Sequence, residues 1–412
     1  MATRVRSYSK INLGLAIGPV RPDGFHGLVT LYQTLALHDL VTVEARRVGW
    51  GPASPSQPTT ISLTTNHVQV PTDARNTAWK MVELALARMG IAAQIAIHID
   101  KQLPVQGGMG AGSANAAAAL IGLERELGVA LPDAERLEIA AEVGSDVPLF
   151  LIGGAILGVG RGEIVSAMPD LPATWCVMAV PEVGVSTPRA FKDWDWLCQE
   201  TRNSDQGSAE SPGLKPPMIE PAYSRLKPAA TPKGTTIPSE LTSPLEPDNL
   251  ERLSHAYASV FGVRPGAKQA SGTSGIVRGL DLESKQDGLE GKSSEQGSTL
   301  NGLAGNILLA LVRTGIENDF ETVVFLQYPL LREIKRLLMG TSANGFFDAH
   351  PADSSGNAVY AALSGSGSAL FGLYQSEAGA REAQRRVQAS GCKAILTETL
   401  PRQEYWRTMF AE

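Results

Sequence analysis

A glycine-rich segment, Pro104–Asn115, contains the residues that most directly suggest chemistry. Four of its residues, at positions 107, 108, 110 and 112, are glycines, and an alanine-rich stretch with helical spacing follows. Glycine lets a backbone take left-handed conformations and approach a ligand closely. The first N–H groups of a helix lack internal partners and lie at the positive end of its dipole. We therefore predict that this segment binds phosphate at the start of a helix.

Two common phosphate-binding patterns do not match this segment. A Walker loop needs lysine after its last glycine, but Ser113 follows Gly112. The triplet Gly291-Lys292-Ser293 fails as well, because Gln286 stands where the leading glycine belongs. The dinucleotide pattern GxGxxG would need glycine at position 113. A loop that merely turns the chain from strand to helix is the alternative, and four glycines before a helix favour anion binding over it.

Lys10 and Asp146 are the best candidates for proton transfer and charge stabilisation. Residues 10–17 alternate in polarity like a strand, so Lys10 shares a polar face with Asn12. Asp146 precedes the apolar run 147–160. A carboxylate beside a lysine can accept the proton of an alcohol, while the lysine offsets phosphoryl charge. Taken singly, Lys10 would be a solvated surface charge and Asp146 a turn cap, so the prediction depends on the two meeting.

The elements that must position these groups mix strands and helices. Ile95–Ile99 alternates as a half-buried strand, and Asn76 and Gly90 suit the two ends of a helix. Apolar runs over 29–44 indicate strands that are interrupted by a turn at His38-Asp39. The segment Leu363–Ala369 suits either an anion-binding nest or a plain hairpin connection before a strand at 369–374. Further helices are predicted over 113–127, 249–261, 306–312 and 330–339. Without regular βαβ order, this mixture indicates an α+β fold.

Composition limits the classes of function. The 412 residues suffice for two globular domains, and 43% are hydrophobic against 19% charged. A net charge of -6, from 36 basic and 42 acidic residues, argues against a nucleic-acid surface. The cysteines and histidines have no metal-site spacing, so no metal ligands are predicted among them. Without a signal or spanning pattern, we expect a soluble cytoplasmic protein that does not act in a membrane. Residues 201–247 and 264–304 have few aromatics and suggest long surface loops.

Three segments together resemble the motifs of the GHMP kinases, the family of galactokinase, homoserine kinase and mevalonate kinase. They are Ser9–Leu13, Pro104–Asn115 and Ser364–Gly367. The resemblance covers roughly residues 5–198 and 306–375, and it is specific for kinases whose alcohol carries a cytidylyl group. Its other parts are Arg21–His26, Tyr32-Gln33-Thr34 where the pattern has F-Q-T, Gly144–Phe150, Gly153–Glu163, Ser186–Pro188 with Phe191, and Asn318–Glu321.

The resemblance implies a two-domain GHMP kinase fold with the active site in the interdomain cleft. The N-terminal domain, 1–165, would hold the ATP loop and the catalytic residues, and 166–412 would form the C-terminal domain with the long loops. ATP and Mg²⁺ would be the cofactors, and the partner would be a small cytidylyl-linked alcohol rather than nucleic acid. Asp146 would be the base, and Lys10 would orient the hydroxyl and stabilise charge. The oligomeric state does not follow from the resemblance.

The resemblance also implies which residues bind each substrate. The rings of Phe25 and Phe191 would stack on the cytosine and the backbone of His26 would pair with it, while Asn12 and Thr187 would contact the rest of the alcohol. Asn76 and Lys101 would lie near the adenosine. The phosphates of ATP would be bound by Pro104, Val105, Gln106, Gly107, Gly108, Met109, Gly110, Ala111, Gly112, Ser113, Ala114 and Asn115.

This chain departs from the family pattern at a few positions. Phe25 replaces a tyrosine, Ala114 replaces a second serine, and Gln106 and Ala111 stand where the family has small residues or glycine. Two alternatives remain open. A GHMP kinase for mevalonate-type or homoserine-type alcohols is disfavoured by Phe191 and the segment 21–26, because those substrates carry no base to stack. A non-catalytic sensor is disfavoured because it would not need a base such as Asp146.

Overall fold

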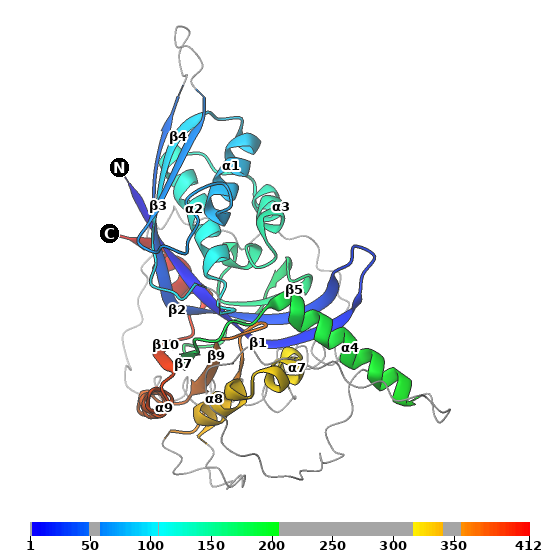
Figure 1. The fold of residues 1–412 in the computed structure, drawn as a ribbon. Helices are drawn as coiled ribbons and strands as arrows, with labels where there is room; N and C mark the ends of the chain where they lie inside the picture. Colours follow the sequence, from blue (N-terminus) through cyan, green and yellow to red (C-terminus); the bar gives the residue numbers. More distant parts are fainter. Residues whose placement is uncertain (1, 49–57, 106, 206–315, 341–355) are drawn as a thin grey trace, which may run out of the picture.

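The computed structural model describes residues 2–48, 58–105, 107–205, 316–340 and 356–412 (Figure 1). The predicted helices 249–261 and 306–312, the predicted loop 264–304 and most of the predicted loop 201–247 lie outside these residues. Residues 201–205 were expected to begin that loop, but they continue helix α4, Thr187–Asp205. The helix can extend this far because its one proline, Pro188, stands in the first turn, where proline is tolerated, and the next glycine comes only at position 207.

Two sheets form the frame of the described residues. In the larger sheet the strands run in the order β11-β1-β2-β4-β3, and β5 and β6 extend it from the far part of β2. All its pairs are antiparallel except β3 with β4. Its strands are β1 Thr3–Val20, β2 His26–Arg47, β3 Thr60–Thr65, β4 Ala93–Asp100, β5 Ala155–Gly160, β6 Ile164–Ala167 and β11 Phe410–Ala411. The smaller antiparallel sheet has the order β10-β7-β9-β8, with β7 Trp175–Val180, β8 Tyr360–Leu363, β9 Leu370–Tyr374 and β10 Lys393–Glu398.

Helices cover the outer faces of both sheets, and the described chain forms four layers (Figure 1). Helices α1–α3 bury apolar residues against the larger sheet, and α4 and α7–α9 do so against the smaller one. A third core, with Ile11 and Leu31 on one side and Met178 and Phe371 on the other, lies between the sheets. The helices are α1 Thr77–Met89, α2 Ala111–Leu127, α3 Asp133–Val143, the 3-10 helix η1 Pro148–Leu151, α7 Phe320–Gln327, α8 Pro329–Met339, α9 Glu377–Ala389 and α10 Arg402–Arg407. This mixture confirms the α+β prediction.

Local sequence signals placed several elements correctly. Asn76 caps α1 by accepting a hydrogen bond from the Ala78 N–H, and Gly90 ends the helix in a left-handed conformation. The turn predicted at His38-Asp39 is wrong, because β2 runs without a break from His26 to Arg47. The Asp39 carboxylate, which would have favoured a turn, is instead buried and paired with groups from another segment. None of the helices in the described part of the chain has the length and apolar character needed to cross a bilayer.

The end of the chain packs on the larger sheet rather than on the smaller one. Strand β11 pairs with the start of β1, with Val5 opposite Phe410. From α10, the Tyr405 hydroxyl donates to the Phe150 carbonyl at 2.6 Å, and the Trp406 indole donates to the Ile152 carbonyl at 2.9 Å. Residues 402–411 therefore support η1, although they lie far outside the range 1–165 predicted for the N-terminal domain. That domain boundary stays a prediction.

A short bridge joins β1 to the N-terminus of α7. The Leu15 N–H donates to the Glu317 carbonyl, and the Asp319 N–H donates back to the Leu15 carbonyl, each at 3.0 Å. The Asp319 carboxylate also accepts a hydrogen bond from the Ile17 N–H at 2.7 Å. Burial, opposed by that hydrogen bond and reinforced by nearby Glu317, raises the pKa of Asp319 from its usual 3.8 to about 6.

This raised pKa predicts a pH-dependent contribution to stability. Because the pKa of Asp319 is higher in the folded chain, the contribution is fully present below pH 3.8 and is lost as pH rises through about 6. Asp319→Asn keeps an acceptor for the Ile17 N–H but cannot ionise. Between pH 5 and 7.5 the wild type should lose about 1–2 kcal/mol of stability relative to the variant in denaturant titrations. If the stability of both proteins changed equally with pH, a raised pKa of Asp319 in the folded chain would be contradicted.

Candidate active site

The glycine-rich segment forms one wall of a cavity of about 330 Å³. Nearly all residues predicted to bind ATP line this cavity. Ala114 is the exception, because it is buried in α2, and Gln106 lies outside the described residues. No sequence motif predicted the loop before α1 that completes the cavity, Gln69–Pro71 and Arg75. The predicted residues that line it are Asn76, Lys101, Pro104, Val105, Gly107, Gly108, Met109, Gly110, Ala111, Gly112, Ser113 and Asn115.

Two of the glycines are required by close backbone approach. Gly108 has φ +76°, and a Cβ there would lie 2.0 Å from the Ser364 carbonyl oxygen. Gly110 has φ +71°, and its Cβ would lie 2.9 Å from the Phe150 ring and 3.1 Å from Lys10 Cγ. Helix α2 begins directly after Gly110, and no side chain caps its N-terminus. Its first N–H groups are therefore available to an anion in the cavity.

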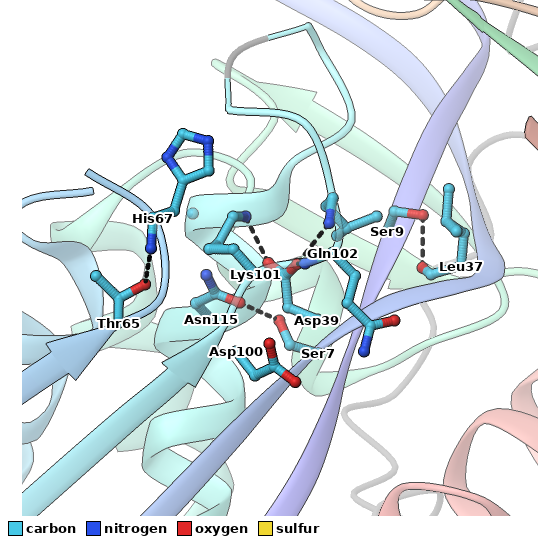
Figure 2. A network of polar contacts seen from close by, with 12 residues as sticks. Ser7, Ser9, Leu37, Asp39, Thr65, His67, Asp100, Lys101, Gln102 and Asn115 are labelled. Carbon is cyan, nitrogen blue, oxygen red and sulfur yellow. Dashed lines mark hydrogen bonds and ion pairs between the residues drawn. The ribbon is translucent and has the colours of Figure 1, made fainter. Parts of the chain in front are cut away.

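Buried polar contacts fix the other walls of this cavity (Figure 2). The Lys101 ammonium lies 2.5 Å from Asp39, whose second oxygen accepts the N–H groups of Gln102 and Leu103 at 2.8 and 2.7 Å. Lys101 thus lines the cavity while its charge is paired with the Asp39 carboxylate. The sequence had instead predicted a turn at Asp39. On the other side, the Ser7 hydroxyl donates to the Asn115 side chain at 2.6 Å and holds it beside the start of α2.

Lys10 and Asp146 meet, as the prediction required. The Lys10 ammonium lies 3.3 Å from Asp146 Oδ2 and donates to Asn12 Oδ1 at 2.6 Å. The Asn12 amide donates in turn to the Thr30 hydroxyl at 2.7 Å. Lys10 is only 3% exposed, whereas Asp146 is 31% exposed. Lys10 is therefore not a solvated surface charge, and the Asp146 carboxylate remains open to a ligand.

The second glycine-serine segment joins the two halves of the site. It is the hairpin connection between β8 and β9, and it also packs on the glycine-rich segment. The Ser364 hydroxyl donates to the Gly108 carbonyl at 2.9 Å, and the Ala369 N–H donates to the Gly107 carbonyl at 3.2 Å. From the bridge to α7, the Asn318 amide donates to the carbonyls of Leu363 and Gly365 at 2.8 and 2.7 Å.

A second, larger cavity of about 720 Å³ begins where the first one ends, and Gly108 lines both. Each residue predicted to bind the alcohol or to act on it lies in its wall. The sequence reasoning missed Tyr32, Arg161, Lys192 and Asp195, which also line it. One feature of the sequence could have pointed to Tyr32, because it carries a hydroxyl at a position where the family pattern has phenylalanine. The predicted residues in the wall are Lys10, Asn12, Phe25, His26, Asp146, Thr187 and Phe191.

Aromatic side chains gather at the end of this cavity away from Lys10. The ring of Phe191 stacks on His26 with centroids 4.9 Å apart and planes 8° from parallel. His26 is held by the Gly18 carbonyl at Nδ1, 2.9 Å away, and by Asp195 at Nε2, 3.2 Å away. Phe25 is 55% exposed, and the Arg161 guanidinium lies 5.0 Å from its ring centre. Within the described chain, no three His, Cys, Asp or Glu side chains are clustered as a metal site.

Part of the chain matches a known protein family. Residues 76–154 match the GHMP kinases N terminal domain. A protein of Nocardioides sp. named 4-diphosphocytidyl-2-C-methyl-D-erythritol kinase is 39% identical over 193 residues, which are 46% of this chain and 62% of that protein. A protein of the same name from Salinispora arenicola is 38% identical over 213 residues, 51% of this chain and 62% of that protein. The matched part therefore spans less than two thirds of these relatives.

Solved structures share the fold of the described part of the chain. A crystal structure of 4-(cytidine 5'-diphospho)-2C-methyl-D-erythritol kinase is similar with a TM-score of 0.55 and 21% identity, covering 96% of this chain and 98% of that one. A homoserine kinase from Cytophaga hutchinsonii is similar with a TM-score of 0.54 and 15% identity, covering 97% of this chain and 95% of that one. At such identities the likeness establishes the fold alone.

The close approach at Gly108 predicts a specific effect on nucleotide binding. Gly108→Ala must displace the Ser364 carbonyl and so distort the cavity, and the dissociation constant for ATP should rise about tenfold or more in calorimetry. Gly128→Ala is the matched control, because Gly128 also has a positive φ, +62°, but no atom within 4 Å of its Cβ position. Equal ATP affinities for the two variants would exclude the Ser364 contact as a determinant of the cavity.

The matched domain includes the cap of α1, the whole glycine-rich segment and Asp146. The described part of the chain is similar in fold to the two solved kinases. The segments that resembled the family motifs in the sequence also lie together in space. Residues 76–154 of the chain therefore carry a match to the GHMP kinases N terminal domain, within a fold that solved kinases share.

Proposed function

We propose that the chain transfers the γ-phosphoryl group of ATP to the 2-hydroxyl of 4-diphosphocytidyl-2-C-methyl-D-erythritol, in the non-mevalonate pathway to isoprenoid precursors. One observation carries the proposal: the Lys10–Asp146 pair lies at the junction of an anion-binding cavity and a larger cavity with an aromatic end. Curated relatives of that name support the choice of substrate. A cytoplasmic location stays part of the proposal.

The side chains at the junction suit phosphoryl transfer to an alcohol. Asp146 takes the proton from the acceptor hydroxyl, the alcohol oxygen forms a bond to the γ-phosphorus, and the bond from that phosphorus to the ADP oxygen breaks. Lys10 stays protonated, orients the hydroxyl and offsets the charge that spreads over the transferred group. Such a reaction needs mainly positioning and charge neutralisation, which a buried lysine beside an accessible carboxylate provides.

The smaller cavity suits the triphosphate of ATP. The uncapped start of α2 and the glycine backbone supply N–H donors, and Ser113 adds a hydroxyl. Asn76 and Lys101 line the same cavity, as residues near an adenosine would. Mg²⁺ bound to nucleotide needs only one or two protein oxygens, and the Ser113 hydroxyl in this cavity could provide one. When bound, the ion would neutralise phosphate charge.

The larger cavity suits an alcohol with a cytidine diphosphate group. Asn12 and Thr187 lie near the Lys10 end, where the methylerythritol would sit. Phe25, His26 and Phe191 supply aromatic faces and a backbone edge for a base at the other end. Arg161 and Lys192 also line this cavity, and their positive charge suits a diphosphate. Mevalonate and homoserine carry neither a base nor a diphosphate that could contact these aromatic and cationic groups.

A panel of alcohols tests the function directly. With ATP and Mg²⁺, ADP release should appear with the cytidylyl-linked methylerythritol and not with mevalonate, homoserine or methylerythritol phosphate. Asp146→Asn is the control, because it keeps the shape of the side chain but cannot act as a base. Its turnover should fall about a hundred- to ten-thousand-fold while ATP affinity is retained. Turnover of mevalonate or homoserine alone would overturn the choice of substrate, and a fully active Asp146→Asn would remove Asp146 as the base.

Phe191 provides a separate test of base recognition. Phe191→Ala removes the aromatic face at the far end of the larger cavity, so KM for the cytidylyl substrate should rise about tenfold or more. KM for ATP should stay unchanged. Trp196→Ala is the matched control, because Trp196 is an aromatic residue of the same helix, is 47% exposed and does not line the cavity. An equal loss for both substrates would remove Phe191 from base recognition.

A further inference from the structure

The hydroxyl of Tyr32 reaches the Asp146 carboxylate from the wall of the larger cavity. It donates to Asp146 Oδ1 at 3.0 Å. Tyr32 is 2% exposed and lies in β2, paired on one side with Asn12 of β1 and on the other with Ile156 of β5. A residue in the interior of a sheet, with both neighbouring strands paired, has little freedom to move.

Two glycines hold the ring of Tyr32 in place. A Cβ at Gly158 would lie 2.6 Å from the Tyr32 ring carbon Cε2, and a Cβ at Gly162 would lie 2.4 Å from the hydroxyl oxygen. Both positions must therefore stay without a side chain for the ring to lie where it does. The contact between Tyr32 and Asp146 depends on this packing and not only on one flexible hydrogen bond.

The two oxygens of Asp146 face different donors. Oδ1 accepts from Tyr32, and Oδ2 lies 3.3 Å from the Lys10 ammonium. The same ammonium lies 5.5 Å from the centre of the Tyr32 ring, so the three side chains form one cluster. Burial, with the nearby charge of Asp146, raises the pKa of Tyr32 well above its usual range. The phenol therefore keeps its proton and remains a donor at any working pH.

We propose that Tyr32 is a positioning residue for phosphoryl transfer, which occupies Oδ1 of Asp146 and leaves Oδ2 as the oxygen that receives the proton of the alcohol. The proton moves from the alcohol to Oδ2, and Tyr32 keeps its own proton throughout. This inference rests on the proposed role of Asp146 as the base. It assigns a task to the hydroxyl that distinguishes position 32 of this chain from the phenylalanine of the family pattern.

The test is Tyr32→Phe, which removes the hydroxyl and keeps the ring between the two glycines. Losing one hydrogen bond to a charged group should lower kcat about tenfold to a hundredfold. KM for the alcohol and for ATP should each stay within about twofold, because ring and cavity are unchanged. An unchanged kcat, or a loss that falls on KM instead, would overturn the inference.

Tyr374→Phe is the matched control. Tyr374 is 1% exposed, and its hydroxyl donates to the Leu338 carbonyl at 2.8 Å, away from both cavities. The melting temperatures of both variants are measured alongside kcat. If Tyr374→Phe loses as much kcat as Tyr32→Phe, a general loss of stability explains both and the inference fails.

A double variant distinguishes action through Asp146 from direct contact with the alcohol. In single-turnover measurements, adding Tyr32→Phe to Asp146→Asn should cause no further loss, since the hydroxyl then has no base to position. A further tenfold loss would overturn the inference. Wild-type inactivity toward the cytidylyl substrate would overturn the proposed function and this inference with it, whereas an active wild type beside an equally active Tyr32→Phe would overturn the inference alone.

Discussion

The buried ammonium of Lys10 is the constraint on which the rest of the site depends. A charge removed from water needs polar partners close by, and Lys10 finds them in Asn12 and Asp146. Its backbone N–H donates to the Met109 carbonyl, which ties β1 to the glycine-rich segment. Gly110 leaves room for its side chain. One residue thus fixes the distance between the smaller cavity, the Asp146 carboxylate and the larger cavity.

The two sheets meet at this site through loops rather than through their cores alone. The connection between β8 and β9 lies on the glycine-rich segment through Ser364, and Ser366 contacts Thr187 at 2.6 Å at the start of α4. The Asn318 side chain donates hydrogen bonds to two carbonyls of this connection. Its neighbours in the chain, Glu317 and Asp319, are hydrogen-bonded to β1. This connection therefore lines the larger cavity and packs on the segment that lines the smaller one, so a movement of the connection would affect both.

Much of the fold could be predicted because its signals are local. The caps of α1, the alternation of β4 and the glycines before α2 lie within a few residues of what they determine. The continuity of β2 could not be predicted in this way, since the partner of Asp39 is 62 residues away. Family resemblance brought Lys10 and Asp146 together in prediction, whereas spacing alone could not. Tyr32 was missed because its contact depends on the register of β2 against β5 and on glycines far along the chain.

The pairing of β11 with β1 has a consequence for biosynthesis. Strand β1 is translated long before its outer neighbour, which exists only when residues 410–411 have been made. The helix that supports η1, and so the segment next to Asp146, arrives equally late. Until then β1 presents an open edge, which can pair with other chains. Contacts between such distant parts of the chain also slow folding. The site can therefore mature only after translation of residues 402–411, so the nascent chain passes through a long interval in which the glycine-rich segment exists without its finished surroundings.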